Sequence, residues 1–192
     1  LASFICTFTF GIFEGYEVFF NPLIDEFGWS RALASSVFSI YAISNSFSAI
    51  IMGRLTDKHG PQKIILVGSF VVGAGLILSS QINTIFHLYF FWGVASFGSG
   101  VLMIPPISAV LRWFTEKKGL AVGIASSGNG IGILLMAPIA TILILGYGWR
   151  ITFMILGIVF LLVLLVAGIL IKSNPKLAGL GVRVKEKGFD LS

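Results

Sequence analysis

Apolar residues are gathered along this chain into six long runs, and charged residues are mainly confined to the short segments between them. The runs lie near Leu1 to Phe20, Ala34 to Met52, Ile64 to Ser80, Phe86 to Leu111, Leu120 to Leu145 and Ile151 to Ile171. Each approaches the roughly 20 residues that a helix needs to cross about 30 Å of hydrocarbon. We therefore predict an all-α membrane protein, with a six-helix transmembrane bundle at residues 1–171 and a cytoplasmic tail at 172–192.

The composition excludes an ordinary soluble domain. Hydrophobic residues make up 56% of the 192 residues and charged residues 11%, whereas a soluble domain carries about 25% charged residues. So few charges cannot cover a surface that faces water. We expect an integral, multi-pass protein of the plasma membrane or an inner membrane, with the lipid bilayer as its first partner.

The basic residues predict the orientation of the helices. They follow the second run (Arg54, Lys58 and Lys63), the fourth (Arg112, Lys117 and Lys118) and the sixth (Lys172, Lys176, Arg183, Lys185 and Lys187), whereas the opposite side has only Arg31 and Arg150. By the positive-inside rule the N-terminus, these two loops and the tail are cytoplasmic. Because the clusters lie at span ends, as topology signals do, the basic charge requires no nucleic-acid partner.

Four of the six predicted helices carry polar residues at helical spacing, which places them on one face. The residues that we expect to line a substrate or coupling cavity are Glu14, Glu17 and Asn21 in helix one, Tyr41 and Asn45 in helix two, Tyr89, Trp92 and Ser96 in helix four, and Ser126 and Asn129 in helix five. The alternative is that the hydroxyl and amide groups merely join helices to one another, each such bond contributing about 0.6 kcal/mol.

Glu14 and Glu17 are the two carboxylates predicted within a span. An acidic side chain near the bilayer centre costs about 2.5 to 3.5 kcal/mol on insertion scales, so such residues generally mark functional sites. Two carboxylates three residues apart repel each other when both are ionised, which favours protonation of one of them. We expect a proton relay or cation site here. The alternatives are that Glu17 reaches the outer surface, or that both pair with a basic residue elsewhere.

Helix five is rich in glycine. Gly119 and Gly123 form one pair of small residues four apart, and Gly128 and Gly132 form another. Such pairs let neighbouring helices approach closely, and they suit either sliding or static packing.

The loop after the second run carries the most specific local pattern, G-R-L-T-D-K-H-G-P-Q-K from Gly53 to Lys63. It resembles the loop motif of the major facilitator superfamily, to which Gly53, Leu55, Asp57, Lys58, Gly60 and Lys63 correspond. Gly53 would let helix two approach a neighbour, and Gly60 would permit the tight turn into helix three. In that family the acidic residue pairs with a basic one as part of a conformational switch; within this chain Arg112 is the candidate partner of Asp57.

The resemblance extends over nearly the whole chain. The segments from Val18 to Ala32, from Arg112 to Ala125 and from Tyr147 to Arg150 look like the monocarboxylate-carrier and oxalate:formate antiporter branch of that superfamily. The resemblance implies half of a twelve-helix fold, built of inverted three-helix repeats, with a C-terminal six-helix half beyond this sequence. It also implies a cavity near the midplane lined by helices one, two, four and five.

These features together predict secondary active transport of a small solute by alternating access. The resemblance favours an organic anion, a mono- or dicarboxylate, moved with a proton or another coupling ion. Glu14 occupies the position where animal monocarboxylate carriers place a lysine, and a carboxylate there cannot attract an anionic substrate directly. The sequence contains no nucleotide-binding loop and no cluster of metal ligands, so we expect neither an enzyme nor a cofactor. The alternative is a six-helix channel or a membrane sensor that does not transport.

Overall fold

The structure, a computed structural model, describes residues 1–114 and 116–171. Every regular element within these ranges is helical, as predicted. In chain order they are α1 (Ala2–Glu14), the 3₁₀-helix η1 (Gly15–Phe19), α2 (Phe20–Phe27), α3 (Arg31–Ser35), α4 (Val37–His59), α5 (Pro61–Ser79), α6 (Ile85–Ser99), the 3₁₀-helix η2 (Gly100–Leu102), α7 (Ile104–Trp113) and α8 (Lys118–Leu170). The tail predicted at 172–192 lies outside the described residues.

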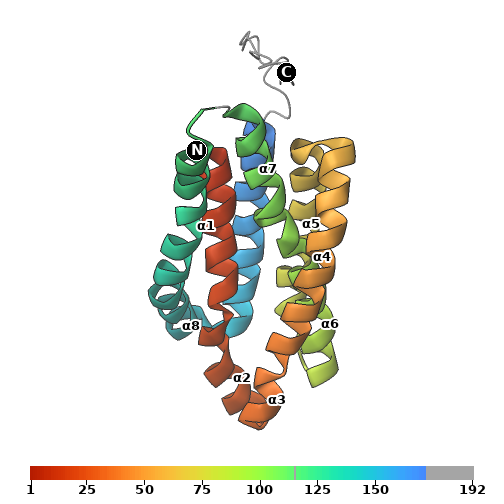
Figure 1. Ribbon diagram of the computed structural model, residues 1–192. Coiled ribbons are helices and arrows are strands. Elements are labelled where there is room, and N and C mark those ends of the chain that lie inside the picture. Colours follow the sequence, from red (N-terminus) through yellow and green to blue (C-terminus); the bar gives the residue numbers. More distant parts are fainter. Residues whose placement is uncertain (115, 172–192) are drawn as a thin grey trace, which may run out of the picture.

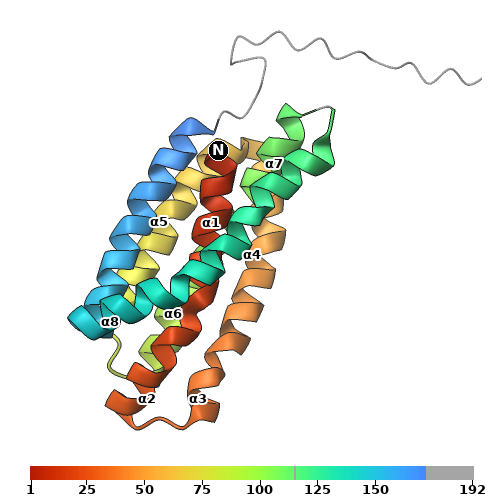
Figure 2. The ribbon, with the colours of Figure 1, turned by 90° about the vertical axis from the view of Figure 1, so that its left-hand side faces the viewer.

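The helices run back and forth along one axis of a single bundle (Figure 1). The N-terminus, the α4–α5 turn and the α7–α8 connection lie at one end, and the α2–α3 connection lies at the other (Figures 1 and 2). We call the first the basic end, because its connections carry the basic residues Lys58, Lys63, Arg112, Lys117 and Lys118. The other is the opposite end.

Four helical stretches in the described part of the chain are long and apolar enough to cross a membrane: Arg31–His59, Pro61–Ser79, Ile85–Trp113 and Lys118–Leu170. The first predicted run is helical from α1 through η1 to α2 but is not among these four. The last stretch is divided at Gly148, whose φ of 78° and ψ of 161° are not helical. The chain reverses direction within α8 (Figure 1), and the break at Gly148 divides α8 into a first arm (118–147) and a second arm (149–170).

Gly60 and Gly148 both have positive φ and lie where one long helix gives way to the next. Gly60 has φ 84° and ψ 154°, and Pro61 follows as the first residue of α5. A side chain at such a φ is strained, whereas proline fits the first turn of a helix because the backbone N–H that it lacks has no helical partner there. The turn that the sequence predicted at Gly60 is therefore confirmed.

The first arm of α8 lies across α1 (Figure 2), and small residues bring the two backbones into contact. A Cβ atom added to Gly132 would lie 2.2 Å from the Phe8 carbonyl oxygen, and one added to Gly11 would lie 2.0 Å from that of Asn129. By contrast, a Cβ atom at Gly119 or Gly123 would meet open space. Of the two predicted glycine pairs, only the one at Gly128 and Gly132 lies against another helix among residues 1–114 and 116–171.

Aromatic side chains form the centre of the bundle towards the opposite end. The ring of Phe19 stacks on that of Phe153 with centroids 4.1 Å apart, and the ring of Phe13 stacks on that of Trp92 at 4.9 Å. Tyr16 packs between these pairs, 3.9 Å from Trp92. This cluster joins α1 and η1 to α6 and to the second arm of α8.

Candidate functional site

Glu14 lies where α1 gives way to the tighter η1, and its carboxylate has a partner on α4. The Tyr41 hydroxyl donates a hydrogen bond to Glu14 Oε1 at 3.1 Å. Both side chains are half-buried, and Tyr41 also packs against the ring of Phe13. A 3₁₀ segment within a longer helix is frequently found at functional hinges. The structure thus brings together two of the predicted residues, from separate helices, around one carboxylate.

Glu17 and Asn21 continue the polar face of the first helix towards the opposite end. Both are exposed, whereas Glu14 is half-buried. Water can therefore solvate Glu17 more readily than Glu14, and the two carboxylates are not equivalent. Of the two, Glu14 is the carboxylate that another helix holds, through Tyr41.

Asn45 and Tyr89 make hydrogen bonds between helices. The Asn45 amide donates to Ser99 Oγ at 2.9 Å, which joins α4 to α6. The Tyr89 hydroxyl lies 2.5 Å from Ser36 Oγ, at the start of α4. Both contacts match the alternative reading of the sequence, in which polar groups connect helices.

Two residues predicted to line the cavity lie in the core instead. The side chain of Trp92 is 3% exposed, between Phe13 and Tyr16. Ser96 is fully buried one turn further along α6, and its hydroxyl has no hydrogen-bond partner within the described residues. Helical spacing places Trp92 and Ser96 on one face of α6 but does not say what covers that face. At Trp92 it is covered by the rings of Phe13, Tyr16 and Phe153.

Ser126 and Asn129 lie on the first arm of α8 and are half-buried. The backbone carbonyl of Asn129 is in contact with Gly11, and its side-chain oxygen is buried without a partner among the residues that the structure describes. Asn129 is therefore at the α1–α8 contact. A cavity of about 530 Å³ lies elsewhere, at the basic end, where α1, α7 and α8 meet around residues such as Ala2, Val110 and Leu120.

The loop motif forms an ion pair at the basic end. Arg112 Nη2 at the end of α7 lies 3.3 Å from Asp57 Oδ1 near the end of α4. The Asp57 side chain is 81% exposed, and ion pairs of that kind contribute about 0 to 1 kcal/mol. Leu55 packs against the core, and Lys58 and Lys63 are exposed. A Cβ atom at Gly53 would meet open space, so the described residues show no close approach of a neighbouring helix at this glycine.

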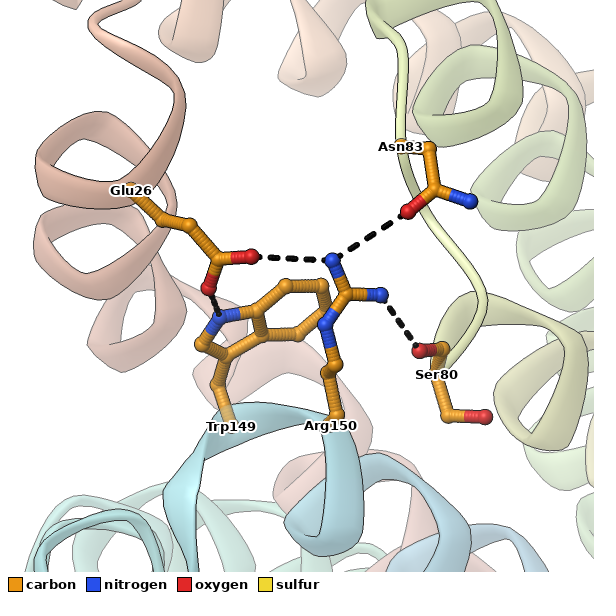
Figure 3. Close-up of polar contacts among 5 residues, drawn as sticks. All are labelled: Glu26, Ser80, Asn83, Trp149 and Arg150. Carbon is orange, nitrogen blue, oxygen red and sulfur yellow. Dashed lines mark hydrogen bonds and ion pairs between the residues drawn. The ribbon is translucent and has the colours of Figure 1, made fainter.

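A second polar cluster, at the opposite end, was not predicted as a site from the sequence (Figure 3). Arg150, which begins the second arm of α8, donates to Glu26 Oε1 at 2.9 Å, to Asn83 Oδ1 at 3.3 Å and to the Ser80 carbonyl at 3.1 Å. The Trp149 indole N–H donates to Glu26 Oε2 at 2.6 Å. The Arg150 guanidinium also lies 4.3 Å from the centre of the Trp149 ring, within the range of a cation–π contact.

The electrostatics of this cluster favour an ionised Glu26. Hydrogen bonds from Arg150 and, to a lesser degree, from Trp149 lower the pKa of the Glu26 carboxyl below its ordinary value, and they outweigh the small opposing effect of burial. The one sequence signal for the cluster was that Arg150 is one of only two basic residues predicted at this end. The sequence did not identify the partner, because six helical elements and 124 residues of chain separate Glu26 from Arg150.

Comparison with known proteins agrees with this all-helical arrangement. Residues 2–191 match the family described as the Major Facilitator Superfamily. The chain is 26% identical over 168 residues to human monocarboxylate transporter 7, covering 87% of this chain and 32% of that protein. It is 26% identical to the oxalate:formate antiporter of Oxalobacter formigenes, covering 94% and 43%, and 32% identical to human monocarboxylate transporter 12, covering 83% and 30%.

A solved structure has the same fold. It is a bacterial homologue of the human lysosomal transporter Spinster in an inward-facing, unoccupied conformation, and it matches with a TM-score of 0.77 and 18% identity over 91% of this chain and 42% of its own. The chain thus spans less than half the length of each of these four proteins, all of which are named as transporters. The family match covers nearly every residue and agrees with the helical fold, and the chain belongs to the major facilitator superfamily.

Proposed function

We propose that this chain forms the first six-helix half of a secondary transporter that moves a small organic anion, a mono- or dicarboxylate, by alternating access. In this proposal, α1 with η1 is the first crossing, and the two arms of α8 are the fifth and sixth. The basic end faces the cytoplasm, because it carries most of the basic residues. A C-terminal half supplies the other six helices and the second wall of the cavity.

The observation that carries the proposal is the carboxylate of Glu14, half-buried on an apolar helix and bonded to Tyr41 of another helix. A carboxylate in a membrane helix generally faces a partner helix or a water-filled cavity, because exposure to lipid would be unfavourable. Glu17 and Asn21 continue the same polar face and are exposed, so this face is suited to a cavity shared with a second half. The relatives named for monocarboxylates and for oxalate and formate support a carboxylate substrate.

Glu14 is suited to coupling rather than to holding the anion. A carboxylate repels a carboxylate substrate unless a proton or a cation neutralises one of the two charges. We therefore assign Glu14 to the coupling ion and place the positive charge that attracts the substrate in the C-terminal half. Proton or cation uptake at Glu14 would then accompany substrate binding.

Transport by proteoliposomes tests this function. The complete transporter should exchange internal for external labelled oxalate, formate or lactate in a saturable way, whereas this chain alone should not, because its polar face is uncovered. Saturable uptake by the chain alone would instead indicate a homodimer of half-transporters. A steady ion conductance without saturable exchange would favour the alternative function, a six-helix channel.

A further inference from the structure

The described helices form two successive triplets with a shared pattern. The first triplet occupies residues 2–79 and the second residues 85–170. In each, the first helix is interrupted by a 3₁₀ segment, η1 or η2. The second helix of each then ends at a glycine of nearly the same geometry, Gly60 (φ 84°, ψ 154°) and Gly148 (φ 78°, ψ 161°).

The two ion pairs found among residues 1–114 and 116–171 occupy corresponding places in these triplets. Arg112 lies next to the end of α7, which completes the first helix of the second triplet. It pairs with Asp57, which lies beside the Gly60 turn of the first triplet. Glu26 lies next to the end of α2, which completes the first helix of the first triplet. It pairs with Arg150, which lies beside the Gly148 turn of the second triplet. Each pair therefore links one triplet to the other. In both pairs the first triplet supplies the acidic residue and the second triplet the basic one.

The pairs lie at opposite ends of the bundle and differ in strength. Asp57 and Arg112 share one hydrogen bond, and the Asp57 side chain is largely exposed. Arg150 instead binds two other groups besides Glu26, and Glu26 is also held by the Trp149 indole (Figure 3). A network of charge-assisted bonds of this kind holds its geometry better than an isolated surface pair.

We propose that Glu26 and Arg150 form a latch at the opposite end, the counterpart of the Asp57–Arg112 pair, which fixes the end of α2 to the turn at Gly148 and limits the opening of that end. Glu26 holds Arg150 to the end of α2, and Asn83 and Ser80 hold it to the α5–α6 connection. The end of α2, the α5–α6 connection and the turn at Gly148 therefore move together. With the latch broken, α2 and the short α3 that packs on it separate from the bundle. This inference rests on the proposed transport function only in calling that end the outer one.

Labelling of a buried cysteine tests the latch without measuring transport. Ala34 on α3 is 1% exposed, and Ala34→Cys places a small thiol on the buried side of α3. Cys6, the single native cysteine of the chain, is also buried and is replaced by alanine to remove background. In the complete transporter, otherwise free of cysteine, Glu26→Gln and Arg150→Gln should each accelerate labelling by an impermeant maleimide by roughly fivefold.

The double variant distinguishes a latch from two separate effects. If the residues act as one pair, Glu26→Gln with Arg150→Gln should label no faster than the faster single variant. Arg150→Lys keeps the charge but loses the forked geometry, so its labelling rate should lie between those of the parent and Arg150→Gln. Matched controls are Asp25→Asn and Arg31→Gln, which remove exposed charges of the same end and should leave the rate unchanged.

Unchanged labelling in both single variants, or effects that multiply in the double variant, would overturn the latch. Exchange of labelled oxalate, formate or lactate is measured on the same preparations. Unchanged labelling together with normal exchange rejects the latch and leaves the transport function standing. Accelerated labelling in a protein that exchanges none of these anions supports the latch and rejects the proposed substrates.

Discussion

The hydroxyl of Tyr41 donates a hydrogen bond to the carboxylate of Glu14, 3.1 Å away, and so connects α4 to the point where α1 becomes a 3₁₀-helix. The contact involves one carboxylate of the two that the sequence placed in the first span. Glu17 is exposed one turn further on. The tertiary structure thus distinguishes two residues that the sequence treated as a pair.

If Glu14 couples transport to a proton or cation, Glu14→Gln should abolish uphill accumulation in the complete transporter while exchange of substrate for substrate continues. The amide retains the size of the side chain and can still accept the bond from Tyr41, so folding and expression should be normal. Glu17→Gln is the matched control and should reduce accumulation less, since water solvates that residue. Accumulation by Glu14→Gln with unchanged pH dependence would show that the residue is structural.

Tyr41→Phe tests the hydrogen bond itself. A hydrogen bond to a charged group contributes about 1.5 to 3 kcal/mol, so its loss should lower the melting temperature of the complete transporter in detergent. If the hydroxyl acts through Glu14, Tyr41→Phe should change the melting temperature less in a protein that already carries Glu14→Gln, because the charged partner is then absent. An equal change in both backgrounds would mean that Tyr41 acts independently of Glu14.

Gly132→Ala should destabilise the protein, because a Cβ atom at Gly132 would lie 2.2 Å from the Phe8 carbonyl oxygen across the α1–α8 contact. Overpacking of this kind costs about 1 to 3 kcal/mol. Gly123→Ala is the matched control on the same arm of α8, where the added atom meets open space. It should be neutral or stabilising by up to about 1 kcal/mol. Thermal unfolding in detergent compares the two, and equal melting temperatures would contradict the close contact.

The pKa of Glu26 predicts a dependence of stability on pH. This pKa is lower in the folded protein, chiefly because of the bond from Arg150, so ionised Glu26 stabilises the fold at neutral pH. That stabilisation is lost as the pH falls through the lowered pKa. The melting temperature of the parent should therefore fall more steeply on acidification from about pH 7 to about pH 3 than that of Glu26→Gln. Parallel curves for the two proteins would indicate that Glu26 titrates normally.

Cysteine labelling from either side of the membrane tests the proposed orientation. A cysteine at His59 should react only from the cytoplasm and one at Ala32 only from outside, because the basic residues gather at the end that carries His59. Both positions are exposed, whereas Thr56 in the same loop region is buried and would report poorly. Reaction of His59→Cys from outside would reverse the orientation.

Local patterns in the sequence were sufficient for the helical class, the approximate limits of the apolar runs and the turn at Gly60. These depend on hydrophobic runs of membrane length and on the conformational freedom of glycine, which neighbouring residues determine. The helical pattern also placed Trp92 and Ser96 on one face of α6. It could not show that aromatic rings of α1, η1 and α8 cover Trp92, because burial depends on helices far away in the chain.

Three features were decided only by the tertiary structure. Arg150 could be recognised from the sequence as an isolated basic residue, but its pairing with Glu26 depends on where the α8 reversal and the end of α2 meet in space. The close contact at Gly128 and Gly132, and the open space at Gly119 and Gly123, follow from where α8 crosses α1. Glu14 gained Tyr41 as a partner because α4 returns beside α1 at that level. Composition and periodicity describe one helix at a time. Each of these contacts joins helices that are distant in sequence, so its partners are determined only by how the helices pack.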